Sequence, residues 1–290
     1  MRTARMLVAL AAATAAAPCQ DAASVRLEHA LHRGDRFAFV IEVEAGIEFD
    51  QPSQNSSMRF AVHFDAEVGA STDGATDVTC TLRRIEVQTA SPTARIRYDS
   101  ADTARQPGSL SQLATLVDER FHVHVAPAGA VVRVDAPARL RELAAERLGA
   151  DFDALFACWF VPLPTDAVAA ETCWTNEAAL VERALSGGKP VLARNKLVSV
   201  TDGVATIRRT FELPAPAPRR GVRFEVRRAE GRIEFDIAAG RVRLAQMDLE
   251  ASAAREPGAA DGTGPEQGTS RLRVRATPVA NATAPDAQDR

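Results

Sequence analysis

The sequence predicts a mainly β fold with some helix: a curled antiparallel sheet, or two such sheets, built from two similar halves, with central helices packed on the apolar face. Three observations predict it. Apolar and polar residues alternate over many segments, which is typical of strands with one buried face. A similar hairpin sequence occurs twice, as STDGATDVTCTLRRIEV at residues 71–87 and VTDGVATIRRTFEL at residues 200–213. Between these copies, residues 136–164 follow a helical pattern instead.

The chain is long enough for one large domain. It has 290 residues, of which 46% are hydrophobic, and this is ample material for a sizeable core. We expect a single β-rich domain over residues 20–277 and a disordered tail at residues 278–290. The domain divides into two halves and a connecting helical segment, at about residues 25–135, 174–277 and 136–164.

The first half opens with two amphipathic strands. Apolar residues repeat with period two in RFAFVIEVEAG and again in MRFAVHFDAEV, opposite charged residues. One buried face and one solvent-exposed face are typical of antiparallel rather than parallel sheets. Asp73 and Gly74 then supply the positive-φ residues of a tight hairpin. A strand, ARIRYDSAD, a helical turn, SLSQLATL, and a second hairpin, FHVHVAPAGAVVRVD, complete this half.

Two helices are expected between the halves. PARLRELAAERL at residues 137–148 has proline at a helix start and an apolar stripe beside charged residues. DFDALFACWF at residues 151–160 presents bulky apolar side chains, and the prolines that follow end it. These helices give the sheet an apolar surface to cover.

The second half returns to β patterns. VLARNKLVSV and VATIRRTFEL flank Asp202 and Gly203, so this hairpin matches the first one. VRFEVRRAEGRIEFDIAAGRVRLAQMDLEA and RLRVRAT add the remaining strands. Neither half can bury its apolar face alone, which explains why two are needed. Duplication of one unit and chance reuse of common hairpin chemistry both remain open.

The N-terminal residues are typical of a secretory signal. MRTARMLVALAAATAAAPC joins Arg2 and Arg5 to an apolar run that is too short to span a bilayer. Cleavage after Ala17 would place proline directly behind the cut, which is unfavourable. Alternatively, AAPC resembles a bacterial lipobox, in which Cys19 becomes a lipidated first residue. We therefore expect an exported protein of the periplasm or cell envelope, with a signal peptide at residues 1–19 and lipoprotein anchoring at Cys19 as an open alternative.

Three cysteines remain beyond the signal, so they cannot all pair within one chain. Cys158 and Cys173 flank the turn WFVPLPTDAVAAET, and an oxidising compartment would permit a disulfide between them. The other interpretation is buried thiols, since Cys80 alternates with Val78 and Leu82 as an inward strand residue. No Cys-x-x-Cys pattern indicates a zinc site, and we expect no metal.

The sequence contains no catalytic motif. His122 and His124 lie on one strand face, but no third metal ligand is placed near them by the sequence. SGGKP at residues 186–190 lacks the upstream glycine and the Ser or Thr of a phosphate-binding loop. No Gly-x-Ser-x-Gly elbow occurs, and Asp99 with Ser100 suits turn capping better than a triad. We therefore expect neither enzyme activity nor a cofactor.

Composition argues against nucleic-acid binding. The net charge is -3, and aromatic residues make up 5% of the chain. Proteins that bind nucleic acids usually carry a basic surface or aromatic stacking platforms. Partners are therefore expected among apolar ligands or envelope proteins, and a membrane only through a lipid anchor.

Three segments carry a resemblance to a known family: RYDSAD at residues 97–102, FHVHVAPAGAVVRVD at residues 121–135 and FVPLPTDAVAAETCW at residues 160–174. In this order they resemble an uncharacterised family of exported bacterial proteins, called DUF6263 as a domain of unknown function. The resemblance covers most of the mature chain. One departure is ETC before Trp174, where Gly-Asp is expected. By architecture, helices on a curled antiparallel sheet are also similar to the carriers that move lipids or lipoproteins across the bacterial periplasm.

Two functions fit these observations. The first is binding of an apolar ligand, a lipid or lipidated peptide, between the sheet and the helices. The second is a structural or protein-interaction module of the envelope with a solid core and no ligand. A connected cavity lined by inward apolar residues would favour the first, and a filled interior the second. The residues expected to contact a ligand are Phe39, Phe60, Phe156, Trp159, Phe160 and Leu163.

Overall fold

One large antiparallel sheet dominates the protein. The computed structural model describes residues 24–50, 52–102, 108, 110–148, 151–178, 191–213, 222–255 and 267–279. Within them, twelve strands form a single open sheet in which all pairs are antiparallel, so the mainly β prediction is confirmed. The predicted signal with Cys19 and the SGGKP segment lie outside the described residues.

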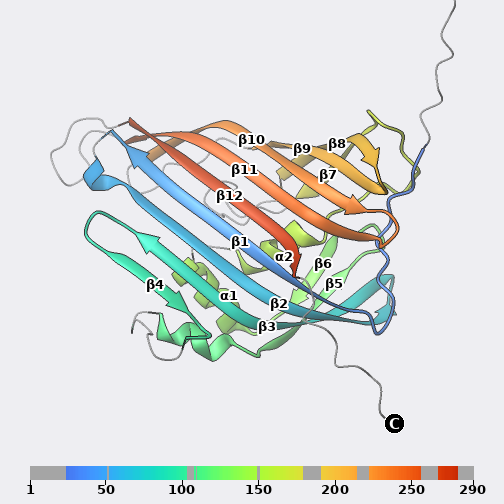
Figure 1. Ribbon diagram of the computed structural model, residues 1–290, viewed down its shortest axis with the longest axis horizontal. Helices are drawn as coiled ribbons and strands as arrows, with labels where there is room; N and C mark the ends of the chain where they lie inside the picture. The colour runs from blue at the N-terminus through green and yellow to red at the C-terminus, as the bar shows by residue number, and fades with distance from the viewer. Residues whose placement is uncertain are drawn as a thin grey trace, which may run out of the picture.

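The strands are β1 (Arg36–Phe49), β2 (Ser56–Thr72), β3 (Ala75–Ala90), β4 (Arg95–Asp99), β5 (Arg120–Val125), β6 (Val131–Asp135), β7 (Cys173–Ala178), β8 (Val191–Thr201), β9 (Val204–Glu212), β10 (Val222–Asp236), β11 (Arg241–Arg255) and β12 (Gln267–Val279). Their order across the sheet is β6, β5, β3, β2, β1, β12, β11, β10, β9, β8 and β7, with β4 also paired to β3. The first and last strands, β1 and β12, therefore pair in the middle of the sheet (Figure 1). β12 reaches Val279, two residues beyond the expected end of the domain.

Two helices follow β6, where helical patterns were expected. α1 (Ala138–Leu143) begins after Pro137 and continues as a π-helical turn, Ala144–Leu148. α2 (Phe152–Trp159) begins at Asp151, whose carboxylate accepts hydrogen bonds from the backbone N–H groups of Asp153 and Ala154. Short 3₁₀ turns lie at Pro52–Gln54 and Ser111–Leu116. None of the helices in the described part of the chain is long and apolar enough to cross a membrane.

The two Asp-Gly hairpins form as the sequence predicts. Asp73 and Gly74 have φ angles of 52° and 77°, and Asp202 and Gly203 have 50° and 75°. Both turns thus use two successive left-handed residues, whose twist matches that of the flanking strands. The first hairpin joins β2 to β3, and the second joins β8 to β9. Whether duplication produced this correspondence stays a prediction.

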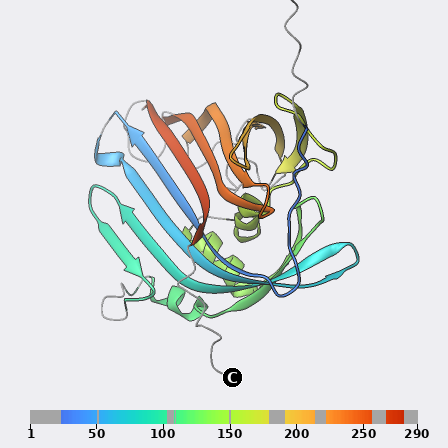
Figure 2. The same cartoon turned by 45° about the vertical axis from the view of Figure 1, so that its right-hand side comes forward.

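The sheet curls around α2. This helix contacts β1, β11 and β12 in the middle of the sheet and also the edge strand β6. Figures 1 and 2 show both helices on the same side of the sheet. The face toward them carries the apolar residues of the period-two pattern, such as Ile41, Val62 and Ile207, which are at most 2% exposed. The opposite face carries charged residues, so each strand separates a core from a polar surface.

Candidate ligand-binding site

The residues predicted to contact a ligand are buried in a packed aromatic cluster. The Trp159 ring stacks on Phe39, with centroids 4.9 Å apart and planes 8° apart. Phe156 meets Phe64 at 5.2 Å and Phe121 at 5.3 Å between ring centroids. The six predicted residues are all at most 5% exposed: Phe39, Phe60, Phe156, Trp159, Phe160 and Leu163.

These six residues do not all meet at one point. Phe39, Phe156 and Trp159 contact one another through their rings. Phe60 lies farther along β2, opposite Val43. Leu163 follows α2, and its backbone N–H donates to the carbonyl of Ala128 at 2.7 Å. The cluster thus joins α2 to the sheet and does not outline a binding cavity.

Little room is left between the sheet and the helices. The cavity beside Trp159 and Phe160 measures about 10 Å³, and the one beneath Leu113 and Leu140 about 20 Å³. A third, beside Cys158 and Arg209, measures about 30 Å³. One water molecule needs ~10–15 Å³ measured in this way, so these cavities have the size of one or two waters and no room for an acyl chain. Side chains therefore fill this described interior.

A much larger hollow, of about 870 Å³, lies at the other end of the strands. Its lining holds two sets of residues that alternate along the strands: a charged set on the polar face, such as Glu44, Arg59 and Arg273, and a row whose side chains point to the core face. Ala45 on β1 pairs with Met58 on β2 and with Leu272 on β12, and Leu272 pairs with Leu249 on β11. On the other side of Met58, the row continues through Thr89 and Ile96, which brings β3 and β4 into the lining. Ligand pockets commonly measure ~300–1,000 Å³, so this hollow has the size of a binding site.

Arginine dominates the charge of this hollow. Its lining contains six arginines and three carboxylates, although the whole chain has a net charge of -3. Four of the arginines have acidic partners, as in the 2.6 Å bond from Arg273 Nε to Asp248. Across the described residues, Arg95 and Arg97 on β4 take part in no ion pair. The six arginines are Arg59, Arg95, Arg97, Arg228, Arg271 and Arg273.

A second hollow adjoins the first. It measures about 470 Å³, and Arg228 and Asp248 line both hollows. Its other lining residues, among them Arg208 and Arg232, come from β8, β9 and β10. The excess of arginine therefore extends across the sheet.

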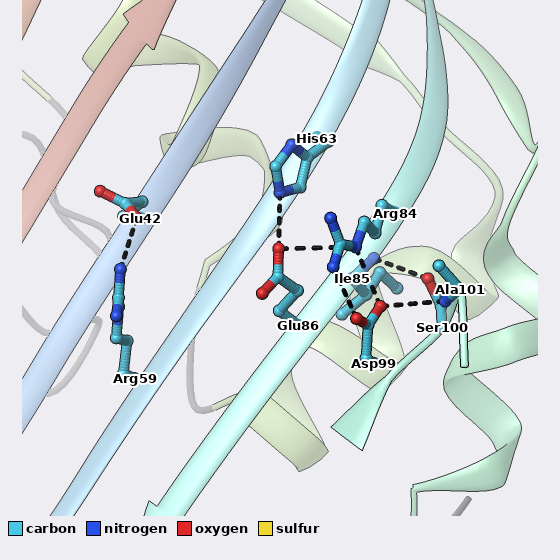
Figure 3. A network of polar contacts seen from close by, with 9 residues as sticks. All are labelled: Glu42, Arg59, His63, Arg84, Ile85, Glu86, Asp99, Ser100 and Ala101. Carbon is cyan, nitrogen blue, oxygen red and sulfur yellow. Dashed lines mark hydrogen bonds and ion pairs between the residues drawn. The ribbon is translucent and has the colours of Figure 1, made fainter. Parts of the chain in front are cut away.

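A polar network holds β4 in place beside the hollow (Figure 3). The Arg84 guanidinium donates to both carboxylate oxygens of Asp99, at 2.9 Å and 2.6 Å. This bidentate bond lowers the pKa of Asp99 to about 2. Ser100 Oγ accepts from the Ile85 backbone N–H at 2.9 Å, and Asp99 accepts from that of Ala101 at 3.0 Å. The expected turn-capping role is confirmed for Asp99, whereas Ser100 accepts its bond from β3, and the two residues fasten the end of β4 to β3.

Three of the five histidines form separate carboxylate pairs and not a shared site. His122 Nδ1 lies 3.1 Å from Asp77, and His124 Nε2 lies 3.0 Å from Asp135. His63 Nε2 lies 3.1 Å from Glu86 (Figure 3). A search of the described residues finds no group of three His, Cys, Asp or Glu side chains that could hold a metal ion.

The expected Cys158–Cys173 disulfide is absent, because both residues are free thiols in the structure. They lie on different elements with separate local contacts. Cys158 is on α2, and its Sγ is 3.7 Å from the Ala154 carbonyl oxygen. Cys173 begins β7, with its Sγ 3.6 Å from the Glu171 carbonyl oxygen. Cys80 is buried in β3, as its alternation with apolar residues predicts.

The sequence analysis missed a buried arginine. Arg209 on β9 is 6% exposed and is surrounded by the apolar interior beside α2. Period-two alternation was the available signal, since Ala205, Ile207 and Arg209 share one face of VATIRRTFEL. This face packs inward, whereas the neighbouring Arg208 points to the polar surface and pairs with Glu230.

Comparison with known proteins finds similarity in fold alone. No family model and no curated protein matches the chain. A solved structure of lipovitellin, described by its lipid–protein interactions, has a TM-score of 0.53 at 9% identity. The match covers 90% of this chain and 27% of that chain, so this protein spans about a quarter of the lipovitellin chain.

Two further structures have lower TM-scores. DynF from the dynemicin biosynthesis pathway of Micromonospora chersina has a TM-score of 0.23 at 8% identity, covering 91% of this chain and 88% of that one. An outer membrane channel from Pseudomonas putida F1 has a TM-score of 0.23 at 10% identity, covering 87% of this chain and 97% of that one.

Proposed function

We propose that this protein is a non-enzymatic binding protein of the bacterial envelope that takes up an amphiphile, such as a lipid or lipidated peptide with an anionic group. The observation that carries the proposal is the 870 Å³ hollow with its mixed lining. The arginines supply donors for an anionic group, and their aliphatic stems supply contacts for a hydrocarbon chain. The ligand position therefore differs from the one that the sequence suggested, beside Trp159.

Arg95 and Arg97 are the side chains best suited to hold the anionic group. An arginine already bonded to a carboxylate must give up that partner before it binds another anion. Among the described residues, Arg95 and Arg97 are bonded to no carboxylate, although the charge of Arg97 helps to lower the pKa of Asp99. Arginine also matches phosphate and carboxylate groups with two parallel N–H bonds. We assign these two residues the role of binding the head group.

The fold is compatible with this function. Lipovitellin, whose structure is described by its lipid–protein interactions, has a similar fold over 90% of this chain. At 9% identity, this likeness concerns the fold, and function has to be argued from the site. The resemblance to periplasmic lipid carriers that we infer from the sequence points the same way.

Native mass spectrometry tests the proposal. The mature protein purified from a bacterial envelope, or offered vesicles that contain phosphatidylglycerol, is expected to carry an extra mass of lipid size that is lost on denaturation. The double variant Arg95→Gln/Arg97→Gln should lose at least tenfold in affinity for phosphatidylglycerol. A matched control, Arg36→Gln/Arg133→Gln, removes two exposed arginines far from the hollow and should bind like the wild type. Equal loss in both double variants, or no adduct in any protein, would overturn the proposal.

The second candidate is a structural or protein-interaction module without a ligand. The filled interior beneath α2 favours it. So do Leu192, Val198 and Val200, three apolar side chains of β8 that are 37–42% exposed beside the edge strand β7. This module predicts a bare chain in native mass spectrometry and no lipid uptake from vesicles.

Export remains part of the proposal. The signal at residues 1–19 and the lipobox-like AAPC support an envelope location. Mass spectrometry of the mature N-terminal peptide distinguishes the two processing routes. A diacylglyceryl group on Cys19 would place the protein on a membrane, whereas an unmodified peptide beginning after the signal would indicate a protein without this anchor.

A further inference from the structure

Arg209 is an arginine without a partner in the interior. It lies on β9 and is 6% exposed. Its Nε and Nη2 atoms are buried and have no hydrogen-bond partner among the residues that the structure describes. Buried polar groups in folded proteins are nearly always hydrogen-bonded, and buried charges are nearly always paired. A guanidinium in this state therefore indicates a missing partner.

The cavity that Arg209 lines is mainly apolar, with Gln246 as a second polar residue of the lining. Its walls come from α2, β7, β9, β10, β11 and β12, and its volume is about 30 Å³. The guanidinium carbon lies 5.4 Å from the centre of the Phe211 ring, which forms one wall. A ring face attracts a cation but accepts none of its N–H bonds in the way that an oxygen does. The donors of Arg209 thus remain free beside a space of water-sized dimensions.

The surroundings do not neutralise the charge. Burial lowers the pKa of Arg209 to about 10, which still leaves the guanidinium protonated at neutral pH. The ionisable group beside it is Cys158, and burial raises the pKa of this thiol to about 12. The thiol is therefore uncharged at neutral pH. Arg241 differs from Arg209 in having an acidic partner. Its Nε is also buried, but its Nη2 donates a hydrogen bond to Asp35 at 2.6 Å.

We propose that Arg209 and this cavity form an anion-binding site for a carboxylate, separate from the arginine-rich hollow. A carboxylate accepts two parallel N–H bonds from one guanidinium. It also carries a single charge in a planar group of three atoms, which suits a small apolar cavity better than a phosphate, with its larger volume and higher charge. The site lies between α2 and the sheet, so a bound carboxylate would link Arg209 to the helix surface formed by Ala157 and Cys158.

Two sources can supply this carboxylate. One is a small free acid of acetate size, which the cavity admits with little change. The other is the head group of a fatty acid, whose chain needs α2 to move away from the sheet. Sodium acetate and sodium decanoate are the two probes that distinguish these sources.

The test is isothermal titration calorimetry of the full chain with each probe at millimolar concentrations. We expect the wild type to bind at least one probe, and Arg209→Met to reduce that affinity at least tenfold. Arg209→Lys, which keeps the charge but lacks the planar pair of donors, should bind more weakly than the wild type. Arg208→Met is the matched control, because it removes an exposed arginine from the adjacent position, and it should bind like the wild type.

The outcomes separate this site from the hollow. Binding of acetate alone assigns a small free acid, and tighter binding of decanoate assigns a fatty-acid head group. Arg95→Gln/Arg97→Gln should leave carboxylate binding at Arg209 unchanged, so failure of one site does not imply failure of the other. Absence of binding with both probes, or equal binding by wild type and Arg209→Met, would overturn the inference.

Discussion

The two ends of the sheet bury their apolar rows in different ways. Near α2, large rings interlock: Phe39 lies against Trp159, and Phe64 against Phe156. The cavities that remain there measure about 10–30 Å³. Near β4, the charged side of the same strands borders a hollow of about 870 Å³. The same strands thus contribute to a close-packed core at one end and to a ligand-sized hollow at the other.

Side-chain size explains part of this difference. In strand β1, Phe39 faces α2, whereas Ala45 lies in the row beside the hollow. In β2, Phe64 packs in the aromatic cluster, whereas Met58 borders the hollow. Aromatic rings are rigid and fill space, whereas methionine is flexible and adapts to a variable neighbour. The sequence therefore encodes the difference strand by strand.

The largest loss of stability is expected when an aromatic ring is removed from the packed end. Phe156 is fully buried and contacts four other rings. Phe156→Ala should lower the free energy of unfolding by about 3–5 kcal/mol, because it removes buried surface and leaves a cavity. Met58→Ala at the hollow should cost less than half as much. Urea denaturation measures both, and equal losses would remove the distinction between the two ends.

Enlarging a small side chain at each end of the sheet tests the same difference in packing. Ala154 on α2 is 3% exposed, so Ala154→Leu should destabilise the protein by about 1–3 kcal/mol through overpacking. Ala45, at the other end of β1, is only partly buried, so Ala45→Leu should change stability by less than about 0.5 kcal/mol. Urea midpoints compare the two variants. A large loss for Ala45→Leu would mean that the row beside the hollow is already close-packed.

His29 links the segment before β1 to the packed end of the sheet. Its protonation should make the stability of the protein depend on pH. Its Nε2 donates to the Val161 carbonyl at 2.9 Å, and burial lowers the pKa of its imidazole below the usual value of about 6.5. A lowered folded-state pKa means that stability is full above pH ~6.5 and falls as acid protonates the ring. His29→Gln should flatten the decline in melting temperature between pH 7.5 and 5. An unchanged slope would show that His29 does not cause it.

Replacement of Asp99, at the hollow end, should have the smallest effect on stability. The bidentate bond from Arg84 lowers the pKa of Asp99 to about 2, so its stabilising contribution is full above pH ~4 and is lost as the pH falls toward 2. Asp99→Asn should therefore remove part of the acid-induced loss of stability in that range. Circular dichroism melts measure it. An identical acid profile in Asp99→Asn would contradict the assigned ion pair.

Much of the fold could be predicted from local patterns. Period-two alternation located the strands, and Asp73-Gly74 and Asp202-Gly203 marked two hairpins, because each signal depends on neighbouring residues. The pairing of β1 with β12 joins distant residues and leaves no local signal. The single open sheet was therefore one of two alternatives until the structure was known.

The site could be predicted only in part. Bulky residues such as Trp159 and Phe160 indicated an apolar interior, but the sequence does not show whether such side chains line a cavity or fill it. The hollow depends on the register of seven strands, which brings Arg59, Arg97 and Arg273 to the same face of the sheet. Alternation could have placed Arg209 on the inward face beside Ile207, but this was not predicted, and its lack of a partner among the described residues is a property of the three-dimensional packing.

The most direct test of the central claim is cross-linking with a phosphatidylglycerol analogue that carries a photoreactive diazirine in its acyl chain. After illumination, peptide mass spectrometry locates the modified residues. Our account predicts adducts on the peptides that contain Met58 and Ile96, at the hollow end of the sheet. Adducts confined to the α2 peptide that contains Phe156 and Trp159 would contradict it, because the ligand would then bind between the sheet and the helices.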